Sequence, residues 1–190
     1  MFTIFKYITT ISLWIHAGAA ITSLIGFQWI KSILDASYAA SGHPVDYATG
    51  QTTFNAEIIK GYYAHMENLG TLEVYQTTQI IDFGFILAMA CMGLFFCTLL
   101  ARFSRAGSWG RRIGLFAGLS LCAGAFSDAI ENCISFIMLA NPVDFAAWLA
   151  LPYSAFASLK FALITVGMLA VVVSFLMGGI GRLFKKPRIG

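Results

Sequence analysis

Four stretches of this chain are long and apolar enough to cross a membrane, and they limit the fold more than any other feature. A membrane-spanning helix needs about 20 mainly apolar residues, and the windows that qualify are residues 7–33, 80–103, 113–140 and 155–183. Of the 190 residues, 58% are hydrophobic and 11% are charged, whereas soluble domains carry roughly 25% charged residues. The sequence therefore predicts one integral membrane domain, residues 1–190, folded as an all-α four-helix bundle.

The charges outside these windows predict how the chain crosses the membrane. The long connection 35–74 has Lys60 as its only basic residue. Most of the other basic residues lie before the first window, in or beside the short connection after the second, or at the C-terminal end of the chain: Lys6, Arg102, Arg105, Arg111, Arg112, Arg182, Lys185, Lys186 and Arg188. Cytoplasmic loops are rich in Lys and Arg. We therefore expect a multi-pass protein of a bacterial plasma (inner) membrane with both termini in the cytoplasm, and no nucleic-acid partner.

The second half of the long connection predicts an amphipathic helix over residues 55–69. Ile58, Ile59, Tyr62, Tyr63 and Met66 recur there at spacings of three and four residues, which is the pattern of an apolar helix face. We expect this helix to lie on the outer membrane surface, with Tyr62 and Tyr63 at headgroup level. It would be either a cap over the bundle or a lid over a lateral entrance.

Two rows of small residues predict close contacts between helices. One is Gly18-x3-Thr22-x3-Gly26 in the first window, and the other is Gly110-x3-Gly114-x3-Gly118 at the start of the third. Small residues four positions apart let the backbones of two membrane helices approach each other. We therefore expect both rows to be covered by neighbouring helices.

The third apolar window contains polar groups that share one helical face. Asp128, Glu131, Asn132 and Ser135 are spaced i, i+3, i+4 and i+7. Each ionisable group inside a bilayer costs about 2.5–3.5 kcal/mol on insertion scales, so this face should look into the bundle. The opposite face is expected to contact lipid, and consists of Phe126, Ile130, Ile134, Ile137 and Met138.

Asp82 in the second window and Lys160 in the fourth are predicted to reach the same layer. At 1.5 Å per residue, Asp82, Lys160 and Glu131 lie roughly 9 to 13 Å below the outer boundary, and Asp128 roughly 18 Å below it. Gln79 adds to a polar stripe on the helix of Asp82. Three carboxylates facing one ammonium are costly to ionise together. Asp128, the deepest and the farthest from Lys160, is the expected protonated group.

These residues predict a site in the outer half of the bundle for a small apolar or amphiphilic molecule, such as a membrane lipid. Asp128 and Glu131 would be a catalytic acid–base pair if the site carries out chemistry. The ligand would be bound by the remaining members of the set, Asn132, Lys160, Asp82, Gln79 and Ser135.

Two alternatives stay open, and the sequence does not decide whether the protein is an enzyme. The carboxylates could relay protons in a translocation protein, with His16 as an inner step. Alternatively, the cluster only joins helices, in a homo-oligomer or in an accessory subunit of a larger membrane complex.

No cofactor and no metal are expected. A haem site would use two facing histidines inside the membrane, whereas His43 and His65 both lie in the long connection. The four cysteines show no CxxC spacing. No phosphate-binding glycine loop is present, and Ser127, Ser135 and Ser158 have no nearby histidine that would favour hydrolase chemistry.

Two short motifs resemble those of a group of uncharacterised bacterial four-span membrane proteins. One is Leu69-Gly70, then Tyr75, six residues and Asp82; the other is Phe126-x-Asp128-x2-Glu131-Asn132, followed by a Pro-containing connection and Lys160. Members of the group often have Gly-Arg between the Leu-Gly pair and the Tyr, where this chain has Thr71-Leu-Glu73-Val. The resemblance implies that Asp82, Asp128, Glu131, Asn132 and Lys160 belong together, and it implies no particular activity.

Overall fold

The computed structural model describes residues 2–183, with backbone only for residue 2 and residues 179–183. Lys185, Lys186 and Arg188 lie outside the described residues, as does the side chain of Arg182. The α-helices, in chain order, are α1 (Phe2–Ile8), α2 (Leu13–Ala40), α3 (Tyr47–Gln51), α4 (Ala56–Asn68), α5 (Leu72–Cys91), α6 (Thr98–Phe103), α7 (Trp109–Leu139) and α8 (Ala150–Leu183). Between residues 2 and 183 there is no β-strand, so the all-α prediction is confirmed.

Four helical stretches of the described chain are long and apolar enough to span a membrane, as predicted. They are Leu13–Ala40, Leu72–Phe103, Trp109–Leu139 and Ala147–Gly178. The second stretch runs from α5 through a π-helical segment, η1 (Met92–Cys97), into α6, and the fourth includes a 3-10 turn, η2 (Ala147–Leu149). The second stretch starts eight residues before the apolar window 80–103. The residues of its first two turns are helical, but they are too polar to be recognised by hydropathy.

Large apolar side chains face outward on the long helices. On α2 they include Trp14 at 85% exposed and Trp29 at 66%, and on α8 they include Leu151 at 64% and Leu169 at 63%. Soluble proteins rarely expose contiguous apolar surfaces of this kind. These faces are suited to contact with lipid tails.

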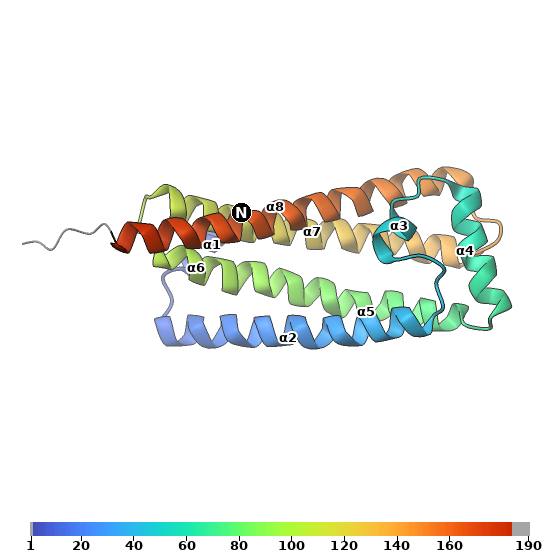
Figure 1. Cartoon of the computed structure of the whole chain (residues 1–190), viewed down its shortest axis with the longest axis horizontal. Coiled ribbons are helices and arrows are strands. Elements are labelled where there is room, and N and C mark those ends of the chain that lie inside the picture. Colours follow the sequence, from blue (N-terminus) through green and yellow to red (C-terminus); the bar gives the residue numbers. More distant parts are fainter. Residues whose placement is uncertain (1, 184–190) are drawn as a thin grey trace, which may run out of the picture. The chain divides into compact units, whose positions relative to one another are not determined.

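The chain divides into two compact units, and each contains segments of the same four long helices (Figure 1). Unit 1 comprises Met1–Ile25, Met89–Cys122 and Leu163–Gly190. Unit 2 comprises Gly26–Ala88 and Ala123–Ala162. The polar set predicted from the sequence lies entirely in unit 2.

In unit 1, the glycine row of α7 is covered by neighbouring helices, as predicted. A Cβ added at Gly114 would lie 2.6 Å from Ser174 Oγ and 2.8 Å from Ala101 Cβ. One added at Gly118 would lie 2.5 Å from the carbonyl oxygen of Gly93. The corresponding prediction for α2 is wrong: a Cβ at Gly18 or at Gly26 would meet no described atom within 4 Å. Spacing alone does not show which face of a helix has a neighbour.

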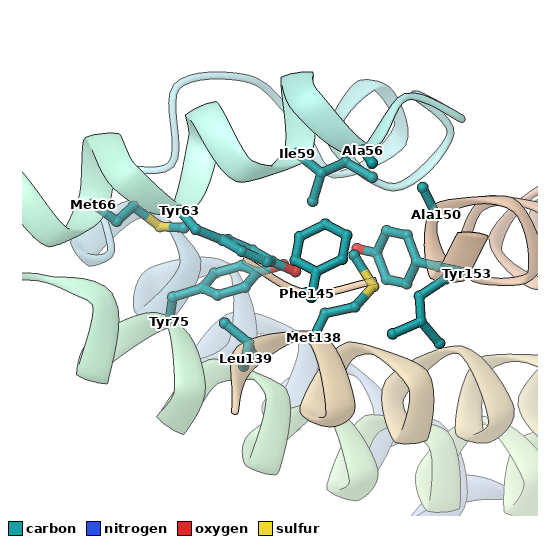
Figure 2. Packing of buried hydrophobic residues seen from close by; sticks show 11 residues of the cluster. Ala56, Ile59, Tyr63, Met66, Tyr75, Met138, Leu139, Phe145, Ala150 and Tyr153 are labelled. Atoms are coloured by element: carbon teal, nitrogen blue, oxygen red, sulfur yellow. The ribbon is translucent and has the colours of Figure 1, made fainter. Parts of the chain in front are cut away.

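In unit 2, α4 runs across the other helices (Figure 1) and packs on them through an apolar cluster (Figure 2). The side chain of Asn55 caps α4 by accepting hydrogen bonds from the backbone N–H groups of Glu57 and Ile58. The apolar face of α4 meets residues of α5, α7, α8 and the connection before α8. This cluster consists of Ala56, Ile59, Tyr63, Met66, Tyr75, Met138, Leu139, Phe145, Leu149, Ala150 and Tyr153.

The helix predicted over residues 55–69 is therefore present, but the expectation for Tyr63 is wrong. Tyr63 is 1% exposed and points into the apolar cluster, so it does not lie at headgroup level. Ile59, Tyr63 and Met66 form the buried row of α4. Tyr62 is one position away from this row, is only partly buried and packs against His43.

Candidate functional site

The polar face of α7 is turned inward, as its spacing predicts. Asp128 is 2% exposed, and Glu131, Asn132 and Ser135 are fully buried. On the opposite face, Phe126 is 69% exposed. The helix thus separates buried polar residues from outward-facing apolar ones over two turns.

Met138 departs from the predicted lipid-facing set. It follows Ser135 by three residues, which places the two on the same face of the helix. Its side chain is fully buried in the apolar cluster beneath α4 (Figure 2). The inward face of α7 is therefore polar around Glu131 and becomes apolar at the end of the helix that α4 covers.

Lys160 of α8 contacts both acidic residues of α7. Its Nζ donates hydrogen bonds to Asp128 Oδ1 at 2.6 Å and to Glu131 Oε2 at 2.5 Å, and the residue is 4% exposed. The expectation that Asp128 is the carboxyl farthest from Lys160 is therefore wrong. Estimates of depth along a helix axis follow the backbone, whereas the long Lys side chain extends several ångströms along the bundle.

Asp82 of α5 has a different partner. The amide nitrogen of Asn132 donates a hydrogen bond of 2.8 Å to Asp82 Oδ2, and Asp82 is 7% exposed. No described cationic group lies within 4.0 Å of its carboxyl oxygens. Because Asp128 and Glu131 share the ammonium, Asp82 is the carboxyl of the set that lacks a counter-charge.

Besides Gln51 Oε1 on α3, five buried polar atoms of unit 2 have no hydrogen-bond partner in the described structure. They belong to α7, α5 and α4, and are Glu131 Oε1, Asn132 Oδ1, Ser135 Oγ, Gln79 Oε1 and Tyr63 Oη. Leaving such a group unsatisfied costs about 1–3 kcal/mol. Three of them can only accept hydrogen bonds, and two are hydroxyls that can donate or accept. The arrangement can therefore take up a molecule that carries hydrogen-bond donors.

Tyr63 is the residue of this region that sequence reasoning missed as a site residue. Its phenol has a pKa raised above the ordinary value, mainly by burial; the neighbouring Ser135 hydroxyl offsets part of this shift, and the negative charge of Glu131 adds to it to a smaller extent. The hydroxyl of α4 is thus electrostatically coupled to the acidic face of α7. The spacing of Ile59, Tyr63 and Met66 was a sequence signal for this orientation. Tyr62 and Tyr63 are adjacent, so only one of them can lie on that row.

His16 belongs to unit 1 and has its own partners there. Its Nε2 lies 3.0 Å from the carbonyl oxygen of Phe95 and 3.0 Å from Thr98 Oγ1, and its Nδ1 lies 3.1 Å from Arg102 Nη1. The ring is fully buried. Both ring nitrogens are therefore engaged within the helices of unit 1.

Among the residues whose side chains are described, no group of three His, Cys, Asp or Glu has the arrangement of a metal site. Comparison with protein families, with curated proteins and with solved structures found no match to this chain. The resemblance to bacterial four-span proteins stays a prediction. The chemistry of the site has to be argued from its own residues.

Proposed function

We propose that this chain is a multi-pass protein of a bacterial inner membrane, with both termini in the cytoplasm, that binds a small amphiphilic molecule in unit 2. The four membrane-capable helices support the location. The concentration of Lys and Arg near the chain ends and in the segment 102–112 supports the orientation.

The five unpartnered polar atoms carry the proposal for the ligand. Glu131 Oε1, Asn132 Oδ1 and Gln79 Oε1 are acceptors, so the polar part of the ligand should carry donors such as hydroxyl or amino groups. The adjoining apolar cluster, with the rings of Tyr63, Tyr75 and Phe145, would contact its apolar part. An amphiphile satisfies both environments.

The ends of α4 support a role for this helix as a lid. Phe54, just before the Asn55 cap, has a φ of 55°, which is strained for a bulky residue. Gly70, just after the helix, has a φ of 69°. A helix flanked by two such positions can move as a body while the connections change conformation. Ligand entry would require α4 to lift off the apolar cluster.

Any reaction at this site would be a proton transfer, with the acidic residues of α7 in the roles expected from the sequence. Lys160 engages Oε2 of Glu131 and leaves Oε1 free. Glu131 can therefore accept a proton from a bound donor group, the ammonium of Lys160 would stabilise the negative charge left on that group, and Asp128 would be the other member of the acid–base pair.

Native mass spectrometry combined with lipidomics tests this proposal. Three proteins are solubilised gently and compared: wild type, the double variant Asp128→Asn plus Glu131→Gln, and the exposed control variant Glu67→Gln. We expect one amphiphile to be bound to wild type and to the control and to be lost from the double variant. Equal binding to all three proteins, with unchanged circular dichroism, would rule the site out.

Proton translocation is a second candidate, favoured by the presence of three carboxylates and a single ammonium in one buried cluster. It predicts proton flux into liposomes that contain the wild-type protein and no flux for Asp128→Asn. A ligand-binding protein without transport would show no difference between the two.

A further inference from the structure

A pocket of about 440 Å³ lies in unit 1, and none of the residues of the unit 2 site lines it. Lys6, Thr9 and Thr10 line it on one side, from the end of α1 and the turn that follows. Gly107, Arg111 and Arg112 line it from the connection before α7 and the first turn of that helix. Three cationic side chains thus surround one pocket.

These cations have no counter-charge within their own unit. All nine acidic residues of the chain lie in the sequence segments of unit 2, whereas unit 1 contains nine of the twelve Lys and Arg residues. Lys6, Arg111 and Arg112 form no ion pair within the described part of the chain. The described residues of unit 1 therefore offer no acidic side chain to neutralise them.

The two arginines are held in place at the pocket. Arg111 Nη2 donates a hydrogen bond of 2.8 Å to Thr9 Oγ1, and the guanidinium of Arg112 lies 5.3 Å from the centroid of the Trp109 ring. Both residues lie in the first turn of α7, which has no acidic residue. The partial positive charge of a helix N-terminus favours anions and disfavours cations there, so a bound anion would relieve an unfavourable arrangement.

We propose that this pocket binds a phosphate group, and specifically that of an anionic phospholipid. Guanidinium groups match the oxygens of phosphate with paired hydrogen bonds. Lipid is the favoured source because Trp14 and Trp109, at the first turns of α2 and α7, are 85% and 68% exposed, and Trp at the ends of membrane helices marks the headgroup level. This inference rests on the proposed membrane location but not on the unit 2 ligand.

The test titrates detergent-solubilised full-length protein with dioleoylphosphatidylglycerol and, separately, with dioleoylphosphatidylcholine, and counts retained lipids by native mass spectrometry. Wild type is expected to retain phosphatidylglycerol preferentially. Because each basic residue near an anionic surface changes affinity roughly five-fold, Arg111→Gln plus Arg112→Gln should weaken binding about 30-fold. Lys6→Gln, which removes no described hydrogen bond of its side chain, should weaken it about five-fold.

The matched control is Arg105→Gln plus Lys31→Gln, which removes the same charge outside the pocket and should retain the lipid as wild type does. Equal retention by the pocket variants and the control would overturn the proposal. A parallel titration with inorganic phosphate distinguishes the source of the phosphate. Binding of millimolar inorganic phosphate to wild type, with no preference for phosphatidylglycerol, would overturn the assignment to a lipid. The unit 2 ligand is read out separately by its loss from Asp128→Asn plus Glu131→Gln.

Discussion

Lys160 Nζ lies 2.6 Å from Asp128 Oδ1, and both side chains are almost fully buried. The contact joins α8 to α7 inside unit 2. The ammonium is shared with Glu131, at 2.5 Å, so one cation holds two acidic residues. A buried group of this kind is costly to disrupt by changing one partner.

Lys160→Met should therefore destabilise the protein strongly. It leaves two carboxylates buried without their cation, and we expect a loss of about 3–5 kcal/mol in the free energy of unfolding, measured by chemical denaturation in detergent. Lys60→Met is the matched control, because its partner Glu57 is 80% exposed and exposed pairs contribute about 0–1 kcal/mol. Adding Asp128→Asn and Glu131→Gln to Lys160→Met should restore most of the stability. If the cluster only joins helices, that triple variant will also keep every function of wild type.

Asp82→Asn should be tolerated much better than Asp128→Asn. Asp82 accepts its hydrogen bond from the amide of Asn132 and has no cationic partner among the described groups, so a neutral side chain of the same shape loses no ion pair there. At Asp128 the same change removes a hydrogen bond from Lys160, and hydrogen bonds to charged groups are worth about 1.5–3 kcal/mol. Thermal unfolding of the two variants in the same detergent measures the difference. Equal loss of stability would show that the carboxyl of Asp82 is charged in the folded protein.

Stability should fall as the pH is lowered through the region below 6.5, because of His43. The pKa of His43 lies below its ordinary value of 6.5, mainly because the ring is buried. Below 6.5 the unfolded chain takes up the proton more readily than the folded protein, so protonation favours unfolding. The ring lies among Tyr38, Tyr62 and Tyr75.

A series of melting temperatures between pH 5 and 8 measures this dependence. We expect His43→Phe, which keeps an aromatic ring, to flatten the profile, and the exposed His65→Gln to leave it as in wild type. A His43→Phe profile that matches wild type would assign the dependence to another group.

Gly118→Ala should destabilise the protein, and Gly18→Ala should not. A Cβ at Gly118 would lie 2.5 Å from the backbone oxygen of Gly93 and 2.9 Å from Phe5 Cε1, and overpacking of this kind costs about 1–3 kcal/mol. At Gly18 a Cβ meets no described atom within 4 Å, so the higher helix propensity of Ala should raise stability by up to about 1 kcal/mol. Chemical denaturation of both variants tests the difference. Equal effects would mean that α7 does not approach Gly93 closely.

The four long helices and the inward face of α7 could be predicted from the sequence because both follow from local spacing, whereas the break between α1 and α2 at residues 9–12, inside the predicted window 7–33, could not. Four apolar runs of sufficient length leave an α-helix as the way to satisfy every backbone group. Residues three and four positions apart must share a helix face, which places Asp128 beside Glu131 and Asn132 whatever the rest of the chain does. The sequence also places Lys160 in the same layer as this face, but it does not decide where the ammonium points, because a long Lys side chain can reach inward or outward.

Which groups actually pair was decided only by the tertiary structure. Lys160 binds Asp128 as well as Glu131, and Asp82 turns to Asn132, because side-chain reach and the rotation of each helix determine contacts between residues far apart in sequence. The same reason explains why Tyr63 is buried while Tyr62 is not, and why the glycines of α7 have neighbours while those of α2 have none. Periodicity tells which residues share a face, but the neighbour of that face is a property of the packed helices.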